Sequence, residues 1–262
     1  MTGGPDGVVR DLILDGAYGF VATAARTGAI FALLPGLGET GIPATVKAGL
    51  ILTVTLVLQP VVAPLLPPRP AADAELARLI AVELANGLWF GWLARVVVAS
   101  LPLAGQFVAD VSGLSNVLMP SPDSGAQTSA ISRLYETAVP ALILSSGLYM
   151  LPLSALAGFY RLVPPGTLPW AGDGAAASVA AVAASFELAL RLAAPFVLTG
   201  FAWNLAVGLI ARFVPRMQVF FVAMPGQIGL ALILLALLSV PLLAAWMEAV
   251  RTGLAALPGG GG

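Results

Sequence analysis

Charged side chains inside apolar stretches are the residues of this sequence that could do chemistry. Burying an ionised group away from water is costly, so such residues usually pair with one another, line a water-filled path or relay protons. Two of them, Glu187 and Arg191, stand four residues apart, so on a helix they share one face and we predict that they neutralise each other. The full set is Arg26, Glu83, Arg95, Glu136, Glu187 and Arg191.

Small residues accompany two of the polar groups at the spacing of helix turns. Gly87 comes four residues after Glu83, and another glycine follows four residues later. Gly208 stands midway between Asn204 and Arg212, again at four-residue steps. Because a stripe of small residues lets another helix approach closely, we predict helix packing at both places, with an interhelical hydrogen bond from the Asn204 amide. A proton relay at Glu83 is the alternative, although no partner stands beside it in the sequence.

Enzyme chemistry is not indicated. The chain has no His and no Cys, which removes the usual general base, thiolate nucleophiles and the commonest zinc ligands. It contains no phosphate-binding GxxxxGK(S/T) loop and no GxSxG nucleophile elbow, and Gly36-x-Gly38 lacks the rest of a dinucleotide fingerprint. We therefore predict no enzymatic activity and no catalytic, cofactor-binding or metal-ligating residues.

The composition is that of a membrane protein. Of the 262 residues, 59% are hydrophobic and 10% are charged, against roughly 25% charged residues in soluble domains. The mean hydropathy is +0.96. The net charge is −1 and the 12 basic residues are scattered singly, so the sequence carries no nucleic-acid-binding footprint.

The elements that must hold the charged residues are apolar segments long enough to cross a membrane. About 20 helical residues span ~30 Å of hydrocarbon, and six stretches qualify, so we predict an all-α fold of the membrane class. Several are too long for one perpendicular span, and internal prolines predict kinks or broken helices. The segments are residues 18–34, 44–66, 76–104, 133–160, 178–209 and 228–246, and the prolines are Pro140, Pro152, Pro195 and Pro241.

The arrangement of these segments across a membrane is left open by the basic residues. Cytoplasmic loops of an ordinary polytopic protein hold most of the Arg and Lys. Simple alternation of the segments divides the basic residues five against four, which selects no orientation. Either the charge rule is weak for this chain, or its segments do not simply zigzag across a bilayer.

The remaining parts of the chain are ends and linkers. Residues 1–17 place Asp6, Asp11 and Asp15 where a secretory signal would carry positive charge, so we expect this N-terminal segment to be retained. Residues 251–262 end in four glycines and are expected to form a flexible tail. Residues 113–129 combine Ser, Gly and Pro with an apolar half that includes a Met, which is suited to a deformable seal.

Several motifs stand in a fixed order along the chain. "IPATVKAGL" and "AGQFVADVSGLS" are followed by "NLAVGLIARFVPRMQVFFVAMP", residues 204–225. The last is similar to an Asn-x-x-x-Gly-x-x-x-Arg-x-x-Pro-Gln-x-x-x-Phe run ending in a proline. Together, over about residues 21–250, they resemble the flagellar biosynthetic protein FliR family, whose injectisome counterpart is the SctT export-apparatus family. The matching residues are Arg26, Pro35, Pro43, Lys47, Glu83, Gly87, Gly91, Asn204, Gly208, Arg212, Pro215, Phe220 and Pro225.

Four positions depart from the family pattern. Arg216 stands where glutamine is usual, Gln106 where an acidic residue often follows Ala-Gly, and Ser121 where an aspartate often precedes Pro122. A common Gly-His in the fourth segment is replaced by Gly-Leu, ending at Leu148. These changes weaken the transfer of contacts made by those side chains and leave the pattern of segments intact.

The resemblance implies a non-enzymatic subunit of the flagellar type III protein export gate, required for flagellum assembly, in the inner membrane at the basal body. Residues 1–262 would be one export-gate domain of helical hairpins, like a fused FliP-like and FliQ-like unit, with a helical core over 18–250. Implied partners are five FliP-like and four FliQ-like subunits in a ring, FlhB-like and FlhA-like export components, unfolded export substrates and membrane lipid. The alternatives are the SctT subunit of a virulence or symbiosis injectisome and, remotely, a small-solute secondary transporter with internal symmetry.

The resemblance also implies a plug in the central loop, mapped here onto residues 113–127. That loop would help to occlude the ring until substrates displace it. Its residues are Gly113, Leu114, Ser115, Asn116, Val117, Leu118, Met119, Pro120 and Pro122. Further along, Arg212, Pro215 and Arg216 would form the tight bend of a helical hairpin, with Phe220 and Met224 packing against neighbouring subunits.

Overall fold

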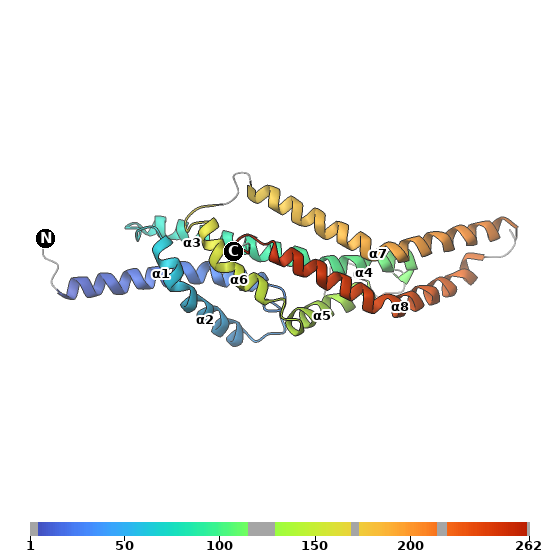
Figure 1. Cartoon of the computed structure of the whole chain (residues 1–262), viewed down its shortest axis with the longest axis horizontal. Coiled ribbons are helices and arrows are strands. Elements are labelled where there is room, and N and C mark those ends of the chain that lie inside the picture. Colours follow the sequence, from blue (N-terminus) through green and yellow to red (C-terminus); the bar gives the residue numbers. More distant parts are fainter. Residues whose placement is uncertain (1–4, 115–128, 169–172, 214–218, 261–262) are drawn as a thin grey trace. The chain divides into compact units, whose positions relative to one another are not determined.

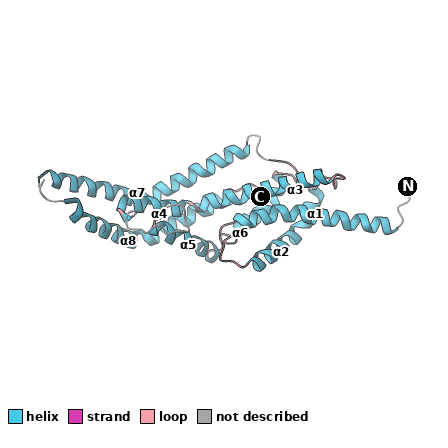
Figure 2. Cartoon of the chain, turned by 180° about the vertical axis from the view of Figure 1, so that it is seen from behind, coloured by secondary structure: helices cyan, strands magenta, loops and turns pink. Residues whose placement is uncertain are grey.

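The chain is built from helices. The computed structural model describes residues 5–114, 129–168, 173–213 and 219–260, and within these ranges the backbone forms helices, turns and short connections, with no strand (Figure 2). The predicted all-α, membrane-class fold is confirmed. In chain order the elements are α1 (Pro5–Leu33), α2 (Ala44–Val62), the short 3-10 helix η1 (Ala63–Leu65), α3 (Asp73–Val98), α4 (Ser100–Ser112), α5 (Ala130–Ser145), α6 (Met150–Leu162), α7 (Asp173–Phe213) and α8 (Val219–Ala255) (Figure 1).

Two of the six predicted segments are pairs of helices. Residues 76–104 divide between α3 and α4, and residues 133–160 divide between α5 and α6, which meet at 75°. The second break is made by Gly147, whose φ of +74° is a backbone conformation that favours glycine. Pro152, one of the internal prolines from which kinks or broken helices were expected, is the third residue of α6, where a helix has no hydrogen bond for proline to remove.

The other internal prolines lie within continuous helices. Pro140 is inside α5, Pro195 inside α7, and Pro225 and Pro241 inside α8. A proline in a helix lacks the N–H that would bond the preceding turn.

Four helical stretches of the described chain are long and apolar enough to cross a membrane, and a fifth if the bent α5–α6 pair counts as one span. They are Ala44–Leu65, Asp73–Val98, Asp173–Phe213 and Ala223–Ala255.

The chain forms two compact units. The first unit comprises Met1–Val96, Ile143–Ala181 and Thr252–Gly262, and the second comprises Val97–Leu142 and Val182–Arg251. The chain therefore passes between them four times, so neither unit is one continuous stretch. The sequence analysis treated 1–262 as one export-gate domain, and that functional assignment stays a prediction.

The first unit has its core between α1, α3 and α6. From Ala22 onward α1 buries one face that includes Ala29, Ile30 and Phe31, because apolar residues recur at helical spacing there. Phe159 of α6 packs against Phe90 of α3, with ring centroids 4.8 Å apart. Residues 8–17 of α1 are exposed, including their large apolar side chains.

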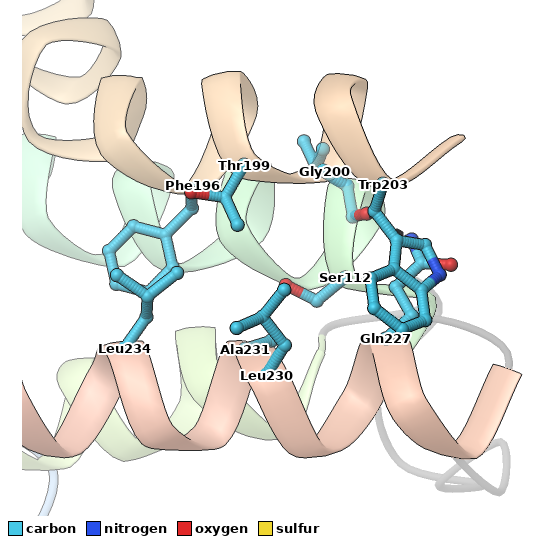
Figure 3. A pocket seen from close by; sticks show the side chains of 10 residues that line it. Ser112, Phe196, Thr199, Gly200, Trp203, Gln227, Leu230, Ala231 and Leu234 are labelled. Atoms are coloured by element: carbon cyan, nitrogen blue, oxygen red, sulfur yellow. Dashed lines mark hydrogen bonds between the residues drawn. The ribbon is translucent and has the colours of Figure 1, made fainter. Parts of the chain in front are cut away.

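Within the second unit, helix α4 forms hydrogen bonds with α8 at both of its ends. Trp246 of α8 is fully buried, and its indole N–H donates to the Ser100 hydroxyl at the start of α4 over 3.1 Å. At the other end of α4, the Gln227 amide of α8 donates to the Val111 carbonyl over 2.8 Å. Around that bond α4, α7 and α8 leave a small pocket, with Phe196 and Thr199 of α7 facing α8 (Figure 3). Helix α8 is thereby bonded to both ends of α4, and α7 lines the same pocket.

The last described residues differ from the expected flexible tail. Helix α8 continues to Ala255, and both Leu254 and Leu257 are buried. Gly259, at φ +92°, passes so close to Gly158 of α6 that a side chain on either glycine would overlap the other's backbone. The composition of residues 251–262 suggested flexibility because glycine is permissive, yet here glycine allows the chain to pack against a helix.

Replacing Gly158 with Leu should release this C-terminal turn, because a side chain there occupies the space of the Gly259 carbonyl. The chain has no Cys, so Leu257→Cys provides a single buried thiol for maleimide labelling. We expect labelling to be about tenfold faster in the Gly158→Leu background, equivalent to ~1.4 kcal/mol of easier opening. Gly49→Leu, at an exposed helical glycine with open space around it, is the matched control. Equal rates in all three backgrounds would contradict the contact.

Candidate functional site

A buried ion pair lies at the centre of the first unit. Arg26 of α1 and Glu83 of α3 make two parallel bonds, Nε to Oε2 at 2.7 Å and Nη2 to Oε1 at 3.1 Å. Their side chains are 0% and 1% exposed. A planar guanidinium facing a carboxylate in this way makes the strongest and most direction-specific side-chain pair that proteins use.

The pair also holds the segment that follows α6. The third guanidinium contact runs from Arg26 Nη1 to the Val163 carbonyl over 2.8 Å. The Gly166 N–H donates to Glu83 Oε1 over 2.8 Å. Glu83 thus accepts three hydrogen bonds and Arg26 donates three, so both charges are satisfied without water. Three separate parts of the chain meet at one ion pair.

Aromatic rings cover the guanidinium. Its central carbon lies 4.3 Å from the ring centroid of Tyr160 and 5.2 Å from that of Phe159, both on α6. A cation over an aromatic face is attracted by the ring's electron density. The Tyr160 hydroxyl in turn donates to the Thr23 carbonyl, one turn before Arg26 on α1, over 3.2 Å. Helix α6 therefore contacts the charged site through rings and through one backbone bond.

The glycines of α3 allow this geometry. A side chain on Gly87 would overlap the carbonyl oxygen of Arg26 and lie 2.7 Å from the Ala29 methyl. One on Gly91 would lie 2.9 Å from the Leu33 side chain. The predicted small-residue stripe therefore faces α1 and brings the two backbones close together. Glu83 stands one turn before Gly87, so the close approach places its carboxylate within reach of Arg26.

Two further α3 residues bind the chain beyond α6. The Asn86 amide, fully buried, donates to the Thr167 carbonyl over 2.8 Å, while its Oδ1 has no partner. The Trp89 indole donates to the Ser178 hydroxyl of α7 over 2.9 Å. With Glu83 these residues form one polar edge at three-residue steps along α3. That edge, which the sequence alone does not reveal, holds Gly166, Thr167 and Ser178 against the helix.

Both members of the ion pair are recognisable in the sequence as charged residues in apolar segments, but their pairing is not. Glu83 was expected to pack or to relay protons and to have no neighbouring partner, yet Arg26 lies beside it across 57 residues of sequence. The available signal was general: two opposite charges in apolar segments each require a counter-charge. Two residues that pair from distant parts of the sequence have no characteristic sequence spacing from which the pairing could be predicted.

The local pair was read correctly. Arg191 Nη2 lies 2.6 Å from Glu187 Oε1, which confirms the predicted neutralisation along one helix face. These side chains are 76% and 62% exposed, so the contact contributes little to stability. Arg95 and Glu136 are exposed in the described structure.

The other N-terminal motif residues shape the turn between α1 and α2. Pro35 is buried directly after α1, and Pro43 precedes the first residue of α2. The Lys47 ammonium donates to the Gly38 carbonyl over 3.0 Å and so ties α2 to the turn. A side chain on Gly38 would press against the carbonyl oxygens of the last turn of α1. These residues hold a compact connection near the ion pair.

The C-terminal motif faces away from the core of the second unit. Asn204 and Arg212 of α7 are exposed, and a side chain on Gly208 would meet open space. Pro225 is exposed on α8. Pro215, Arg216 and the side chain of Phe220 lie outside the described residues, as does the expected bend. The interhelical contact predicted for Asn204 is not made within the described chain.

The start of the predicted plug loop is described and the rest is not. Gly113 ends α4 in the left-handed conformation, φ +73°, and Leu114 follows it. Ser115, Asn116, Val117, Leu118, Met119, Pro120 and Pro122 lie outside the described residues. Among described residues, no group of three His, Cys, Asp or Glu side chains is placed to hold a metal.

Comparison with known proteins assigns the family. Residues 17–253 match the family described as "Bacterial export proteins, family 1". The chain belongs to this family. The match takes in the whole Arg26–Glu83 site and most of α8, so the resemblance inferred from the motifs is confirmed.

Named relatives of the bacterial export family come from flagellar and translocation systems. The chain is 31% identical over 227 residues to "Flagellar biosynthetic protein FliR" of Caulobacter vibrioides, covering 87% of this chain and 90% of that protein. It is 28% identical over 226 residues to the Bacillus subtilis protein of the same name, covering 85% and 86%. It is also 28% identical over 237 residues to "Yop proteins translocation protein T" of Yersinia pestis, covering 87% and 88%.

Breaking the buried pair from one side should destabilise the protein strongly. Glu83→Ala leaves the Arg26 charge buried without its carboxylate and should lower the free energy of unfolding by about 3–5 kcal/mol, whereas Arg26→Met with Glu83→Met should cost much less. The measurement is unfolding of the purified full-length chain in detergent. Glu187→Ala, which removes the exposed pair, is the control and should change stability by under ~1 kcal/mol. A double variant as unstable as the single one would refute the argument.

Proposed function

We propose that this chain is a non-enzymatic subunit of the flagellar type III protein export gate, required for flagellum assembly. The observation that carries the proposal is the similarity to the FliR protein of Caulobacter vibrioides along 90% of that protein's length. The family match over residues 17–253 supports it. The subunit works by its shape and its surfaces, and it acts in the bacterial inner membrane at the flagellar basal body.

The exposed apolar surface supports a role inside an assembly. Only 6% of the most apolar stretch of α8 and 17% of that of α2 is buried within the chain, against 44% for α3. Side chains such as Phe201, Phe213 and Leu237 are more than two-thirds exposed. Helices of this kind need lipid or other protein around them. In our proposal the surroundings are FliP-like and FliQ-like subunits, five and four copies, with FlhB-like and FlhA-like components beside them.

The outward-facing motif on α7 supports a protein neighbour. Asn204 and Gly208 lie on one exposed face, and a polar amide beside a small residue is suited to a second helix at close range. Lipid tails offer the amide no hydrogen-bond partner. We therefore place a neighbouring subunit against this face of α7, which matches the packing expected from the sequence.

The closed ion pair supports a structural role over solute transport. A relay carboxylate must exchange protons with water or with a neighbouring group, while Glu83 is enclosed and holds three donors. Such a pair fixes the positions of α1, α3, Val163 and Gly166. That is the requirement of a wall component that stays rigid while unfolded substrates pass.

The central loop supplies the moving part of the proposal. Residues 113–127 help to occlude the lumen of the assembled ring until export substrates displace them. Opening has to cost only a few kcal/mol if substrate engagement is to shift the closed population appreciably. The loop begins at a rigid point, because Gly113 caps α4 and α4 is bonded to α8 at both of its ends.

The second candidate is the equivalent SctT subunit of an injectisome. The 28% identity to the Yersinia translocation protein over 237 residues favours it. Both candidates use the same wall and plug, so the structure is shared and the exported proteins differ. The identity to the Caulobacter flagellar protein, 31%, leads us to place the flagellar role first.

Complementation distinguishes the two systems. Expressed in a Caulobacter vibrioides strain that lacks FliR, this chain should restore swimming on soft agar to a measurable fraction of normal, because its family-specific surfaces match over most of the length. The Glu83→Ala variant should fail to do so, and Glu187→Ala should behave as the unchanged chain. Restored Yop secretion in a Yersinia strain lacking translocation protein T, with no swimming in Caulobacter, would reverse the assignment.

Removing the central loop tests the plug. Deleting residues 115–126 and joining the ends with a short Gly-Ser linker should leave assembled complexes permanently permeable to small ions, since nothing of this chain then enters the lumen. Ion flux into vesicles that contain the co-purified complex measures the effect, and complexes with the unchanged chain are the control. Unchanged permeability in complexes of normal composition would count against the plug.

A further inference from the structure

The base of the central loop is held by one side chain, Gln106 of α4. Its Oε1 accepts the N–H of Ser129, 23 residues later, over 3.1 Å. Its Nε2 donates to Asp110 Oδ1, one turn further along α4, over 3.0 Å. Gln106 therefore connects the helix before the loop to the residue at which the chain returns.

That residue starts α5. Ser129 is buried, and its hydroxyl accepts the N–H of Ser132 over 3.1 Å, which is the N-cap contact of a helix. Its carbonyl accepts the Arg133 N–H over 2.9 Å. The position of Ser129 thus sets where α5 begins. Because Gln106 holds the N–H of this same residue, it determines where that start lies along α4.

The two helices touch through their backbones at this point. The Ser132 hydroxyl donates to the Pro102 carbonyl over 2.9 Å. A side chain on Gly105 would lie 2.8 Å from the Tyr135 ring and 3.0 Å from the Ser132 Cα. Gly105 precedes Gln106 directly, so the close contact presents the Gln106 side chain to Ser129. The base of the loop is therefore a packed junction of α4 and α5.

The junction needs an amide at position 106. The side chain must accept from the Ser129 N–H and donate to Asp110, and the glutamine amide has separate oxygen and nitrogen atoms for these two bonds. A glutamate would keep the acceptor, lose the donor and stand beside the Asp110 carboxylate. The residue that departs from the family pattern here is thus matched to Asp110 within this chain.

We propose that Gln106 is a positioning residue for the central loop, which sets the register between α4 and the start of α5 through paired acceptance from Ser129 and donation to Asp110. Both ends of the loop are then fixed, one by the Gly113 cap and the other by the Ser129 cap. The structural part of this inference stands on the contacts alone. Its link to occlusion rests on the proposed function.

Spin labels can measure the junction in the full-length chain. Because the chain has no Cys, Leu103→Cys on α4 and Ala130→Cys at the start of α5 supply the only two labelling sites. The label-to-label distance is measured by pulsed electron paramagnetic resonance in membranes that contain the co-expressed partner subunits. With Gln106 present we expect one narrow distance distribution.

Variants at two positions test the pairing. Gln106→Leu and Gln106→Glu should each broaden the distribution, with about a fivefold larger frayed population, as expected when a net hydrogen bond is lost. Gln106→Glu combined with Asp110→Asn returns a donor opposite an acceptor and should restore the narrow distribution. A general packing defect would not be repaired by this exchange. Gln59→Leu, on α2 in the first unit, is the matched control for loss of an amide elsewhere.

The outcomes separate the inference from the proposed function. Unchanged distances in Gln106→Leu, or a double variant as broad as Gln106→Glu, would overturn the positioning role whatever the cells do. Ion leak that rises in Gln106→Leu and falls back in the double variant would support the link to the loop. A broadened junction without any leak, in complexes where deletion of the loop does leak, would refute that link alone. If the unchanged chain restores no swimming and shows no loop-dependent leak, the proposed function is rejected. The positioning role of Gln106 would still hold if the distances change as expected.

Discussion

The fold of the first unit depends on the need to neutralise two charges in an apolar interior. Arg26 and Glu83 are each costly to bury alone, and together they satisfy one another only when α1 and α3 lie in one register. The glycines of α3 allow the helices to approach, and the rings of α6 close the site from the other side. The two parallel hydrogen bonds prevent α1 and α3 from sliding along each other. The ion pair therefore selects one helix register, whereas apolar contacts alone would allow many.

The residues of the family pattern divide into two groups with opposite surroundings. Arg26, Glu83 and Gly87 face inward and hold the chain's own helices together. Asn204, Gly208 and Pro225 are exposed on the second unit, and a side chain on Gly208 would meet open space. Inward residues specify the subunit, and in our proposal the outward ones specify its neighbours. In this proposal, one set of family residues stabilises the fold of the subunit and another set contacts the neighbouring subunits.

Structural features that depend on nearby residues could be predicted from the sequence, whereas contacts between residues far apart in the sequence could not. Runs of apolar residues located six helical segments, two of which are pairs of helices, and the four-residue step of Glu187 and Arg191 identified their contact. The break at Gly147 was missed because proline is the more visible breaker, while the positive φ that this turn needs is a property of the folded backbone. The Arg26–Glu83 pair, the Gln106 junction and the docked glycines each join positions far apart in the chain. Such pairings are decided by tertiary contacts. A mostly apolar sequence is compatible with many alternative pairings, so the sequence does not specify which one forms.

The bare surface of α8 has a consequence for how the protein is made. This helix is synthesised after the other described helices, and it has the least buried of the four candidate membrane spans, with 6% of its most apolar stretch buried. A ribosome releasing such a segment into water would produce an aggregate, so insertion into the bilayer has to accompany translation. The indole of Trp246 can reach Ser100 only after most of α8 has been synthesised. Closure of the second unit is therefore among the last steps in the biogenesis of the subunit.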